Sequence, residues 1–182
     1  MKSRLARDIG SIAAAQWYRR TLARTIAAAR AARIDLAICA APSAAVFGST
    51  VRAAAPVRDQ QRGDLGRRMA LAAKCQPGFT VIVGSDIPDL APTILRAAVR
   101  SAARFDLLIG PARDGGYYLI GLRTPAHAFR LFAKVRWSSA HALADTLANV
   151  PKHWRVHLLP ILADVDVAAD LKPRHWHRLS EN

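Results

Sequence analysis

The chain has 182 residues, 52% of them hydrophobic, which is enough to bury one core and too few for two ordinary domains. No run of eighteen or more uncharged apolar residues occurs, and residues 1–10 carry charges where a signal peptide has an apolar stretch. We therefore expect a cytoplasmic protein without a membrane partner. The 27 Lys and Arg outnumber the 13 Asp and Glu, which gives a net charge of +14.

The positive charge is spread along the chain, without a basic patch or interleaved aromatic residues. Nucleic-acid binding needs such an excess of positive charge to neutralise phosphates, but it also needs the charge to be clustered. Three interpretations stay open, in this order of preference: dispersed solvated arginine, a phosphate-rich ligand, and nucleic acid.

The two cysteines, Cys39 and Cys75, are far apart in the sequence and outside a Cys-x-x-Cys spacing. This spacing fits a reducing compartment and argues against a thiolate zinc site. We expect both to be packing residues.

The first half of the chain predicts a long amphipathic helix rich in alanine, a short buried strand, an irregular connection and a second helix. These elements cover, in chain order, residues 9–33, 34–40, 43–61 and 65–74. Asp64 directly precedes the second helix and is its expected N-cap.

The second half alternates short apolar runs with helical patterns. The predicted strands cover 79–83, 105–109, 117–122 and 155–159, and the predicted helices cover 91–104, 126–132 and 139–147, with a last helix or frayed tail over 172–182. This alternation predicts a single-domain α/β protein with three layers, α/β/α, and a mostly parallel sheet covered on both faces.

Polar residues that directly follow strands are the candidate site, because ligands of open α/β sheets bind beyond the carboxyl ends of the strands. Asp86 lies on a glycine-containing turn after the strand at 79–83, and a carboxylate there suits Mg²⁺. Asp164 and Asp166 follow the last strand, and Asp166 could supply a second carboxylate. One or two carboxylates with substrate phosphates suffice for Mg²⁺, although helix caps and turns explain such aspartates equally well.

Other polar segments are ambiguous. The glycine turns at 63–66 and 114–117 more often serve a positive φ angle than a phosphate. His175 and His177 could ligate a metal, but a solvated pair is the favoured interpretation. Ser138 and Ser139 lack the strand-turn-helix setting of a nucleophile elbow, which disfavours a hydrolase triad.

Six segments together are more specific than any one of them. In chain order they are Lys2-Ser3-Arg4-Leu5-Ala6, Gln60-x-x-Gly63-Asp64-Leu65-Gly66-x-Arg68-Met69, Gly84-Ser85-Asp86-Ile87-Pro88-Asp89-Leu90, Gly110-Pro111-Ala112-x-Asp114-Gly115-Gly116-Tyr117-Tyr118, Trp137-Ser138-Ser139 and Asp164-Val165-Asp166. This order resembles the bacterial arsenosugar-biosynthesis-type glycosyltransferases, a domain-of-unknown-function group in the nucleotide-diphospho-sugar transferase superfamily. The match runs across nearly the whole chain.

The resemblance implies a fold of the glycosyltransferase-A type and a transferase that uses Mg²⁺ or Mn²⁺, a nucleotide or nucleotide-sugar donor and a small-molecule acceptor. It implies that Asp86 is the catalytic, metal-coordinating carboxylate and that Asp166 is its partner at the metal. The implied substrate- and nucleotide-binding residues are Lys2 and Arg4 at the phosphates, Gln60, Gly63, Asp64, Gly84 and Ser85, and Asp114, Gly115, Gly116 and Tyr117 on the acceptor side. Phospholactate guanylyltransferases look similar in the same region, so nucleotidyl transfer is an alternative, as is a non-catalytic nucleotide-binding module.

The chain departs from the family pattern at one point. Family members begin with an apolar strand and a Pro-Gly turn before the Lys-Thr/Ser-Arg-Leu-Ala stretch, whereas Met1 directly precedes Lys2 here. We therefore expect the domain, residues 1–182, to lack the first strand and half of the nucleotide loop. Such a domain would have two facing strand edges with unpaired N–H and C=O groups.

Overall fold

Two helices at the N-terminal side are separated by a glycine. The structure is a computed structural model that describes residues 3–41, 43, 45, 48–75, 78–123 and 125–172. Gly10, with a φ angle of 86°, separates α1 (Ser3–Ile9) from α2 (Ser11–Ala31), because glycine adopts such angles without steric penalty. The helix predicted over 9–33 is confirmed from Ser11 to Ala31, and the preceding residues form a helix of their own.

A small two-stranded sheet follows α2. β1 (Ile38–Ala40) and β2 (Val57–Asp59) pair in parallel, and α3 (Ser49–Ala54) lies between them in the sequence. The prediction of an irregular connection over 43–61 is therefore wrong for its second half. Both missed elements are short and largely exposed, so neither shows the hydrophobic periodicity on which the prediction depended.

The larger sheet has the strand order β3-β5-β4-β6. Its strands are β3 (Thr80–Val83), β4 (Leu107–Pro111), β5 (Tyr117–Leu122) and β6 (Val156–Leu158). β5 runs antiparallel to both of its neighbours, with Ile120 opposite Ile82 on one side and Ile109 on the other. β6 runs parallel to β4 at the edge of the sheet.

The sheet is thus mixed, where a mostly parallel one was expected. The reason is the connection between β4 and β5, which consists of residues 112–116 only. Parallel neighbours need a crossover of about a dozen residues or more, so a connection this short joins antiparallel strands. The α/β class itself is confirmed.

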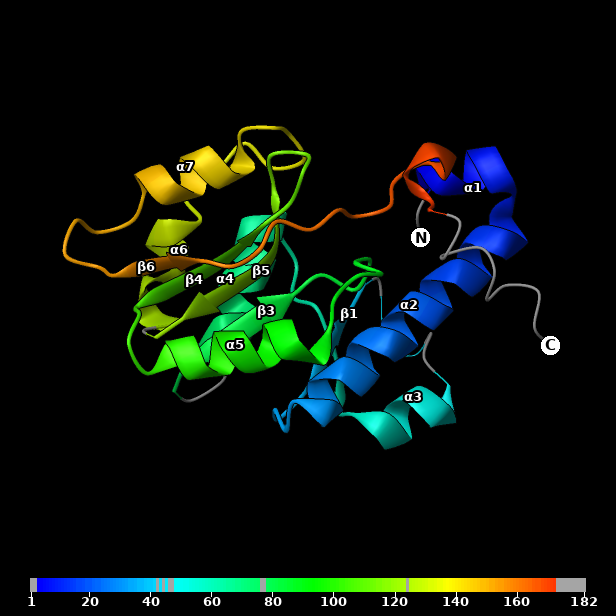
Figure 1. Cartoon of the computed structure of the whole chain (residues 1–182), viewed down its shortest axis with the longest axis horizontal. Helices are drawn as coiled ribbons and strands as arrows, with labels where there is room; N and C mark the ends of the chain where they lie inside the picture. Colours follow the sequence, from blue (N-terminus) through cyan, green and yellow to red (C-terminus); the bar gives the residue numbers. More distant parts are fainter. Residues whose placement is uncertain are drawn as a thin grey trace.

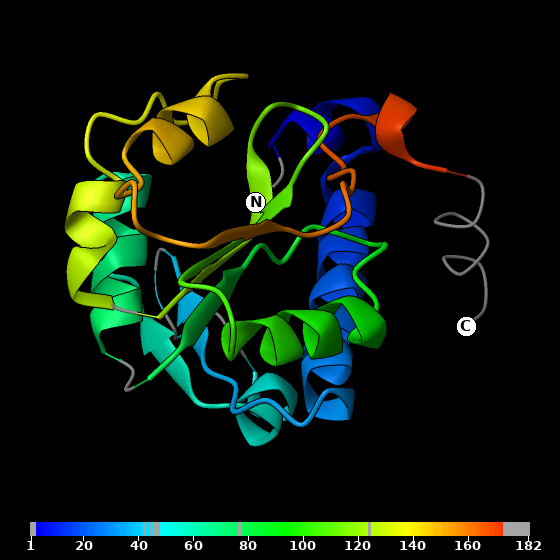
Figure 2. The ribbon, with the colours of Figure 1, turned by 60° about the vertical axis from the view of Figure 1, so that its left-hand side comes forward.

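Helices cover both faces of this sheet (Figures 1 and 2). Leu108 and Leu119 face a core shared with α2 and α5 (Pro92–Ala102), whereas Leu107 and Ile109 face the opposite core. That second core includes residues of α4 (Leu65–Lys74), α6 (Ala128–Leu131) and α7 (Ala142–Ala148). The short helix η2 (Pro125–His127) contacts α4 and α6. The three-layer arrangement follows from this alternation of side chains along the strands. Among the described helices, none is long and apolar enough to span a membrane.

After β6 the chain crosses to the other end of the molecule (Figure 1, orange) and reaches η3 (Ala168–Asp170), which packs on α1. Val165, in this crossing segment, is only 1% exposed and belongs to the same apolar cluster as Leu5 and Trp17. The crossing segment is therefore anchored to α1 and α2 by buried apolar contacts.

The two sheets do not share a strand pair within the described residues, where β1 pairs only with β2 and β3 only with β5 on its side. Each sheet therefore has an edge strand whose outer backbone groups lack a strand partner in this part of the chain.

Candidate functional site

The turn that follows β3 carries the first predicted carboxylate. The N–H of Gly84 donates to the carbonyl oxygen of Tyr118 at 2.8 Å, and the hydroxyls of Ser85 and Tyr18 lie 2.9 Å apart. A Cβ atom at position 84 would lie 3.0 Å from Asp86 Oδ1, so the absence of a side chain there lets the carboxylate fold back over the turn. Asp86 is half-buried.

Two further contacts hold the rest of this turn. Ile87 is only 3% exposed and packs in the core between the sheet, α2 and α5. Asp89 accepts a hydrogen bond from Lys172 Nζ at 3.2 Å, which connects the turn to the chain that follows η3. The segment 84–89 is thus fixed on both sides of Asp86.

The second predicted carboxylate, Asp166, lies beside α1. Its Oδ2 atom is 3.6 Å from Arg4 Nη1, so the structure brings together the two residues that were implied for metal and phosphate. The side chain of Asp166 is 42% exposed and that of Arg4 is 71% exposed, and an ion pair this exposed contributes little stability. Arg4 and Asp166 can therefore exchange this contact for contacts with a ligand at low free-energy cost.

Hydrogen bonds fix the backbone around Asp166. Asp8 Oδ2 accepts from the N–H of Ala168 at 2.9 Å, and Asp170 Oδ2 accepts from the N–H groups of Asp166 and Val167, each at 2.9 Å. Because Val165 is buried, Asp164 and Asp166 on either side of it both point away from the apolar cluster.

Consecutive residues of α2 connect the two carboxylate-bearing segments. Tyr18 contacts Ser85 next to Asp86, and Trp17 shares an apolar cluster with Val165 next to Asp166. Among the described residues, no group of three or more His, Cys, Asp and Glu side chains could hold a metal ion by itself. The predicted donor set is two carboxylates, and two carboxylates suit Mg²⁺ or Mn²⁺ when substrate phosphates supply further oxygens. Lys2 lies outside the described residues, as do His175 and His177.

In the turn before α4, the predicted site residues hydrogen-bond to neighbouring residues of the protein. Asp64 Oδ1 accepts from the N–H of Arg67 at 2.7 Å, which confirms the predicted N-cap. Gln60 Nε2 donates to the Cys39 carbonyl at 3.1 Å, and its Oε1 accepts from Arg68 Nη1 at 3.2 Å. Gly63 has a φ angle of 127°, as expected for a glycine turn. Gln60, Gly63 and Asp64 thus shape this loop, and their role toward a nucleotide stays a prediction.

The turn between β4 and β5 packs against the segment before α7. Asp114 Oδ1 accepts from the N–H of Gly116 at 2.9 Å, and Gly115 has a φ angle of 85°. Tyr117 lies under this turn, with its hydroxyl 3.3 Å from Thr146 Oγ1, and burial raises the pKa of its phenol. The burial thus favours the neutral phenol of Tyr117.

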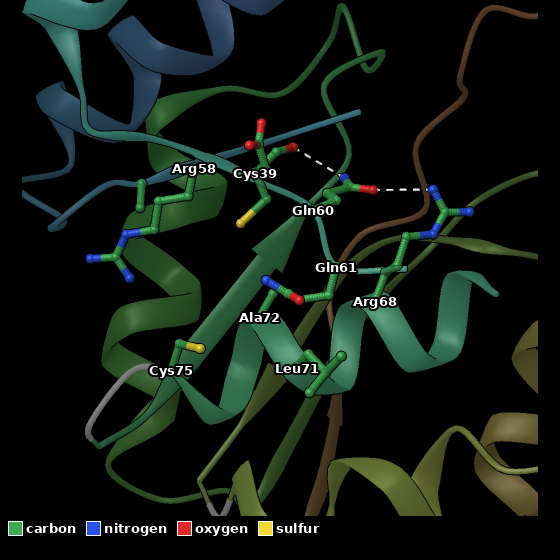
Figure 3. Close-up of a pocket in the computed structure, with 10 residues that line it drawn as sticks. Cys39, Arg58, Gln60, Gln61, Arg68, Leu71, Ala72 and Cys75 are labelled. Carbon is green, nitrogen blue, oxygen red and sulfur yellow. Dashed lines mark hydrogen bonds between the residues drawn. The ribbon is translucent and has the colours of Figure 1, made fainter. Parts of the chain in front are cut away.

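A small pocket lies between β1, β2 with the residues that follow it, and α4 (Figure 3). Cys39, Cys75, Gln60 and Arg68 are among its lining residues. Both cysteines are exposed, so the expectation that they are packing residues is wrong. Desolvation raises the pKa of the Cys39 thiol, an effect that the nearby Arg58 partly offsets. The exposure of Cys39 was not predictable, because β1 is a short edge strand whose sequence does not indicate which side chains face solvent.

A family match is found for most of the chain. The family whose model matches is described as an uncharacterized protein conserved in bacteria (DUF2064), and the match covers residues 21–139. The chain belongs to this family. The matched range includes the turns at 63–66, 84–86 and 114–117 together with Trp137, whereas Arg4 and Asp166 lie outside it.

Solved structures show the same fold. A crystal structure of a proposed nucleotide-diphospho-sugar transferase from Desulfovibrio desulfuricans G20 is similar with a TM-score of 0.86 and 30% identity, over 100% of this chain and 83% of that chain. Structures of Rv0371c from Mycobacterium tuberculosis H37Rv, alone and in complex with manganese, have TM-scores of 0.52 and 0.51 and identities of 22% and 21%. They cover 89% and 87% of this chain and 84% of each of those chains, and at this identity they show the fold alone. A comparison with curated proteins finds no match.

Proposed function

We propose that the protein is a transferase that binds a nucleotide-activated donor together with Mg²⁺ or Mn²⁺ and passes a glycosyl group to a small-molecule acceptor. The observation that carries the proposal is the placement of Asp86 and of the Arg4–Asp166 pair on segments that contact neighbouring residues of α2. The similarity to a proposed nucleotide-diphospho-sugar transferase supports the same reaction class.

In this proposal Asp86 and Asp166 hold the divalent ion. The ion, when bound, neutralises the donor diphosphate and stabilises the departing nucleotide. Arg4 leaves its exposed contact with Asp166 and donates to the phosphate oxygens, since a guanidinium binds phosphate through charge-assisted hydrogen bonds. Ser85 and Tyr18 keep the turn that carries Asp86 in place.

The proposal is tested by melting the protein with a panel of nucleoside diphosphates, nucleoside triphosphates and nucleotide sugars, with and without Mg²⁺ or Mn²⁺. A ligand at about 100 times its dissociation constant stabilises the folded state by about 2.7 kcal/mol, which raises the melting temperature measurably. We expect this increase to require the ion and to be lost in Asp86→Asn. Asp35→Asn, a matched control at an exposed aspartate, should keep it.

The products then decide the reaction. Release of a nucleoside diphosphate supports glycosyl transfer, whereas release of pyrophosphate from a nucleoside triphosphate identifies the nucleotidyltransferase alternative. Saturable binding without turnover identifies a non-catalytic module. Equal nucleotide affinity of Asp86→Asn and the parent, with and without the ion, would refute the role of Asp86 at the metal.

A further inference from the structure

The connection between α6 and α7 contains a segment, residues 134–141, that borders two of the predicted turns. We call it the Trp137 loop. The indole of Trp137 meets the rings of Tyr117 and Phe132 edge-on, with centroid distances of 6.2 and 5.9 Å. A Cβ atom at Gly66 would lie 2.8 Å from Trp137 Cζ2, so the indole rests directly on the first turn of α4. Trp137 therefore touches residues from both the 63–66 and the 114–117 turns.

The same loop also meets the glycine turn through its backbone. A Cβ atom at Gly115 would lie 2.3 Å from the carbonyl oxygen of Ala140, and the N–H of Leu143 donates to the Gly115 carbonyl at 3.0 Å. The turn between β4 and β5 can approach the loop this closely only because residue 115 has no side chain.

One ion pair holds the loop in this position. Asp145, on α7, accepts three hydrogen bonds from Arg136: from the backbone N–H at 2.9 Å, from Nε at 2.9 Å and from Nη2 at 2.8 Å. This two-pronged, charge-assisted geometry is stronger and more directional than an ordinary surface ion pair. Ser139 Oγ donates to the Arg136 carbonyl at 2.6 Å and closes the loop on itself.

The backbone of the loop is strained, which shows that its contacts hold it in place. Lys134 and Ser138 have φ angles of 56° and 58°, in the left-handed region that residues other than glycine rarely occupy. Such conformations persist where surrounding contacts determine them, and they occur often at ligand-binding sites. Here they flank Arg136 and Trp137.

The topology places the turn that this loop contacts at the same end of the sheet as Asp86. β3 and β4 are both antiparallel to β5, so their carboxyl ends, followed by Asp86 and by the 112–116 turn, lie at one edge of the sheet. Ligands of open α/β sheets bind at that edge. We propose that the Arg136–Asp145 pair positions the Trp137 loop against the Gly115 turn to form the acceptor-side wall of the transfer site. This inference rests on the proposed function.

The positioning role is tested by hydrogen exchange of the whole chain in Arg136→Gln and Asp145→Asn, with Arg130→Gln and Asp35→Asn as controls at exposed residues that make none of these contacts. We expect exchange to accelerate by about tenfold or more in both 134–142 and 112–116, with β4 and β5 unchanged. Acrylamide quenching of Trp137, taken as the difference from Trp137→Phe, should increase in parallel. Asp145→Glu, which keeps the carboxylate, should restore much of the protection.

A second variant disturbs the contact between the loop and the turn by changing the turn. Gly115→Ala should loosen the Trp137 loop while the Arg136–Asp145 pair is intact, because the added methyl group meets Ala140. If residues 112–116 exchange at the parental rate in Arg136→Gln and Asp145→Asn, the loop and the turn are independent and the positioning role is refuted.

Steady-state kinetics separate the acceptor wall from a general loss of structure. With the substrates found in the nucleotide panel, Asp145→Asn should raise the acceptor KM by about tenfold at unchanged donor affinity, which corresponds to about 1.4 kcal/mol. An equal loss of donor affinity would refute the acceptor-side role. If the parent binds no nucleotide at all, the proposed function fails and the acceptor role fails with it, while hydrogen exchange still decides the coupling of loop and turn.

Discussion

Arg33 has a φ angle of 57° and shows how a single residue can end a helix at some cost. Its N–H donates to the Arg30 carbonyl at 2.9 Å, and the N–H of Ile34 donates to the Ala29 carbonyl at 3.2 Å. These are the two hydrogen bonds of a Schellman motif, whose left-handed position glycine usually occupies. The two bonds satisfy carbonyls at the end of α2, but an arginine in this conformation is strained.

We predict that Arg33→Gly raises the free energy of unfolding by about 0.5 to 1 kcal/mol, because relief of roughly 1 to 2 kcal/mol of strain exceeds the entropy that glycine loses on folding. Chemical denaturation measures the change. Arg30→Gly is the control within α2, and it should lower the free energy of unfolding by about 1 kcal/mol. A loss of stability in both variants would show that the Arg33 side chain contributes more than its backbone costs.

At the scale of elements, Asp106 connects three segments at the start of β4. Its carboxylate accepts from the N–H of Arg155 at 2.9 Å, and ion pairs of 3.3 and 3.4 Å join it to Arg123 and Arg155. The backbone hydrogen bond from Arg155, with its guanidinium and that of Arg123, lowers the pKa of the Asp106 carboxyl. The beginning of β6 is thereby fastened to β4.

Because the pKa of Asp106 is lower in the folded state, its contribution to stability is present above its ordinary pKa of about 4 and is lost as the pH falls through the folded-state value. We predict that Asp106→Asn is less stable than the parent at pH 7 and that the difference shrinks below about pH 4. Urea unfolding at several pH values measures this. A difference that is constant with pH would assign the effect to packing, and Asp35→Asn should show no comparable difference at any pH.

Strong local patterns made the main elements predictable. β5 was predicted with its observed bounds, Tyr117–Leu122, because an apolar run this short that contains two tyrosines and follows a glycine turn is typical of a strand. The direction of β5 differs from the predicted one because the 112–116 turn is shorter than the crossover that a parallel strand requires. α3 and β2 were missed because they bury almost nothing.

The position of Asp86 was predictable because it directly follows a strand whose end Gly84 marks. Its role at a metal stays a prediction. The Arg136–Asp145 pair was not predictable, because the conformation of the loop between the two residues does not follow from hydrophobic periodicity. Trp137 belongs to one of the six sequence segments, but its contact with Gly66 depends on how α4 packs, which only the folded chain shows.

At the scale of the whole molecule, apolar contacts and hydrogen bonds join the peripheral elements to the sheet. α2 packs with α5 on one face, and the chain after β6 returns to α1 through Val165 and η3. Residues far apart in sequence, such as Lys172 and Asp89, are joined in this way. The proposed site lies where these long-range connections converge, so its geometry depends on the complete fold.

In the part of the chain that the structure describes, the outer edges of β1 and β3 have no strand partner, and this affects colloidal behaviour. Strand edges without a partner template pairing between molecules, whereas a net charge of +14 keeps the molecules apart. Raising the salt concentration from about 0.1 M to about 0.3 M shortens the Debye length from about 10 Å to about 6 Å and weakens this repulsion, so we expect the hydrodynamic radius in dynamic light scattering to grow with salt. Cys39→Lys, which places a charge on β1, should suppress the growth, whereas Cys75→Lys, off the strand, should not. A radius that is constant with salt would mean that other parts of the molecule shield these edges.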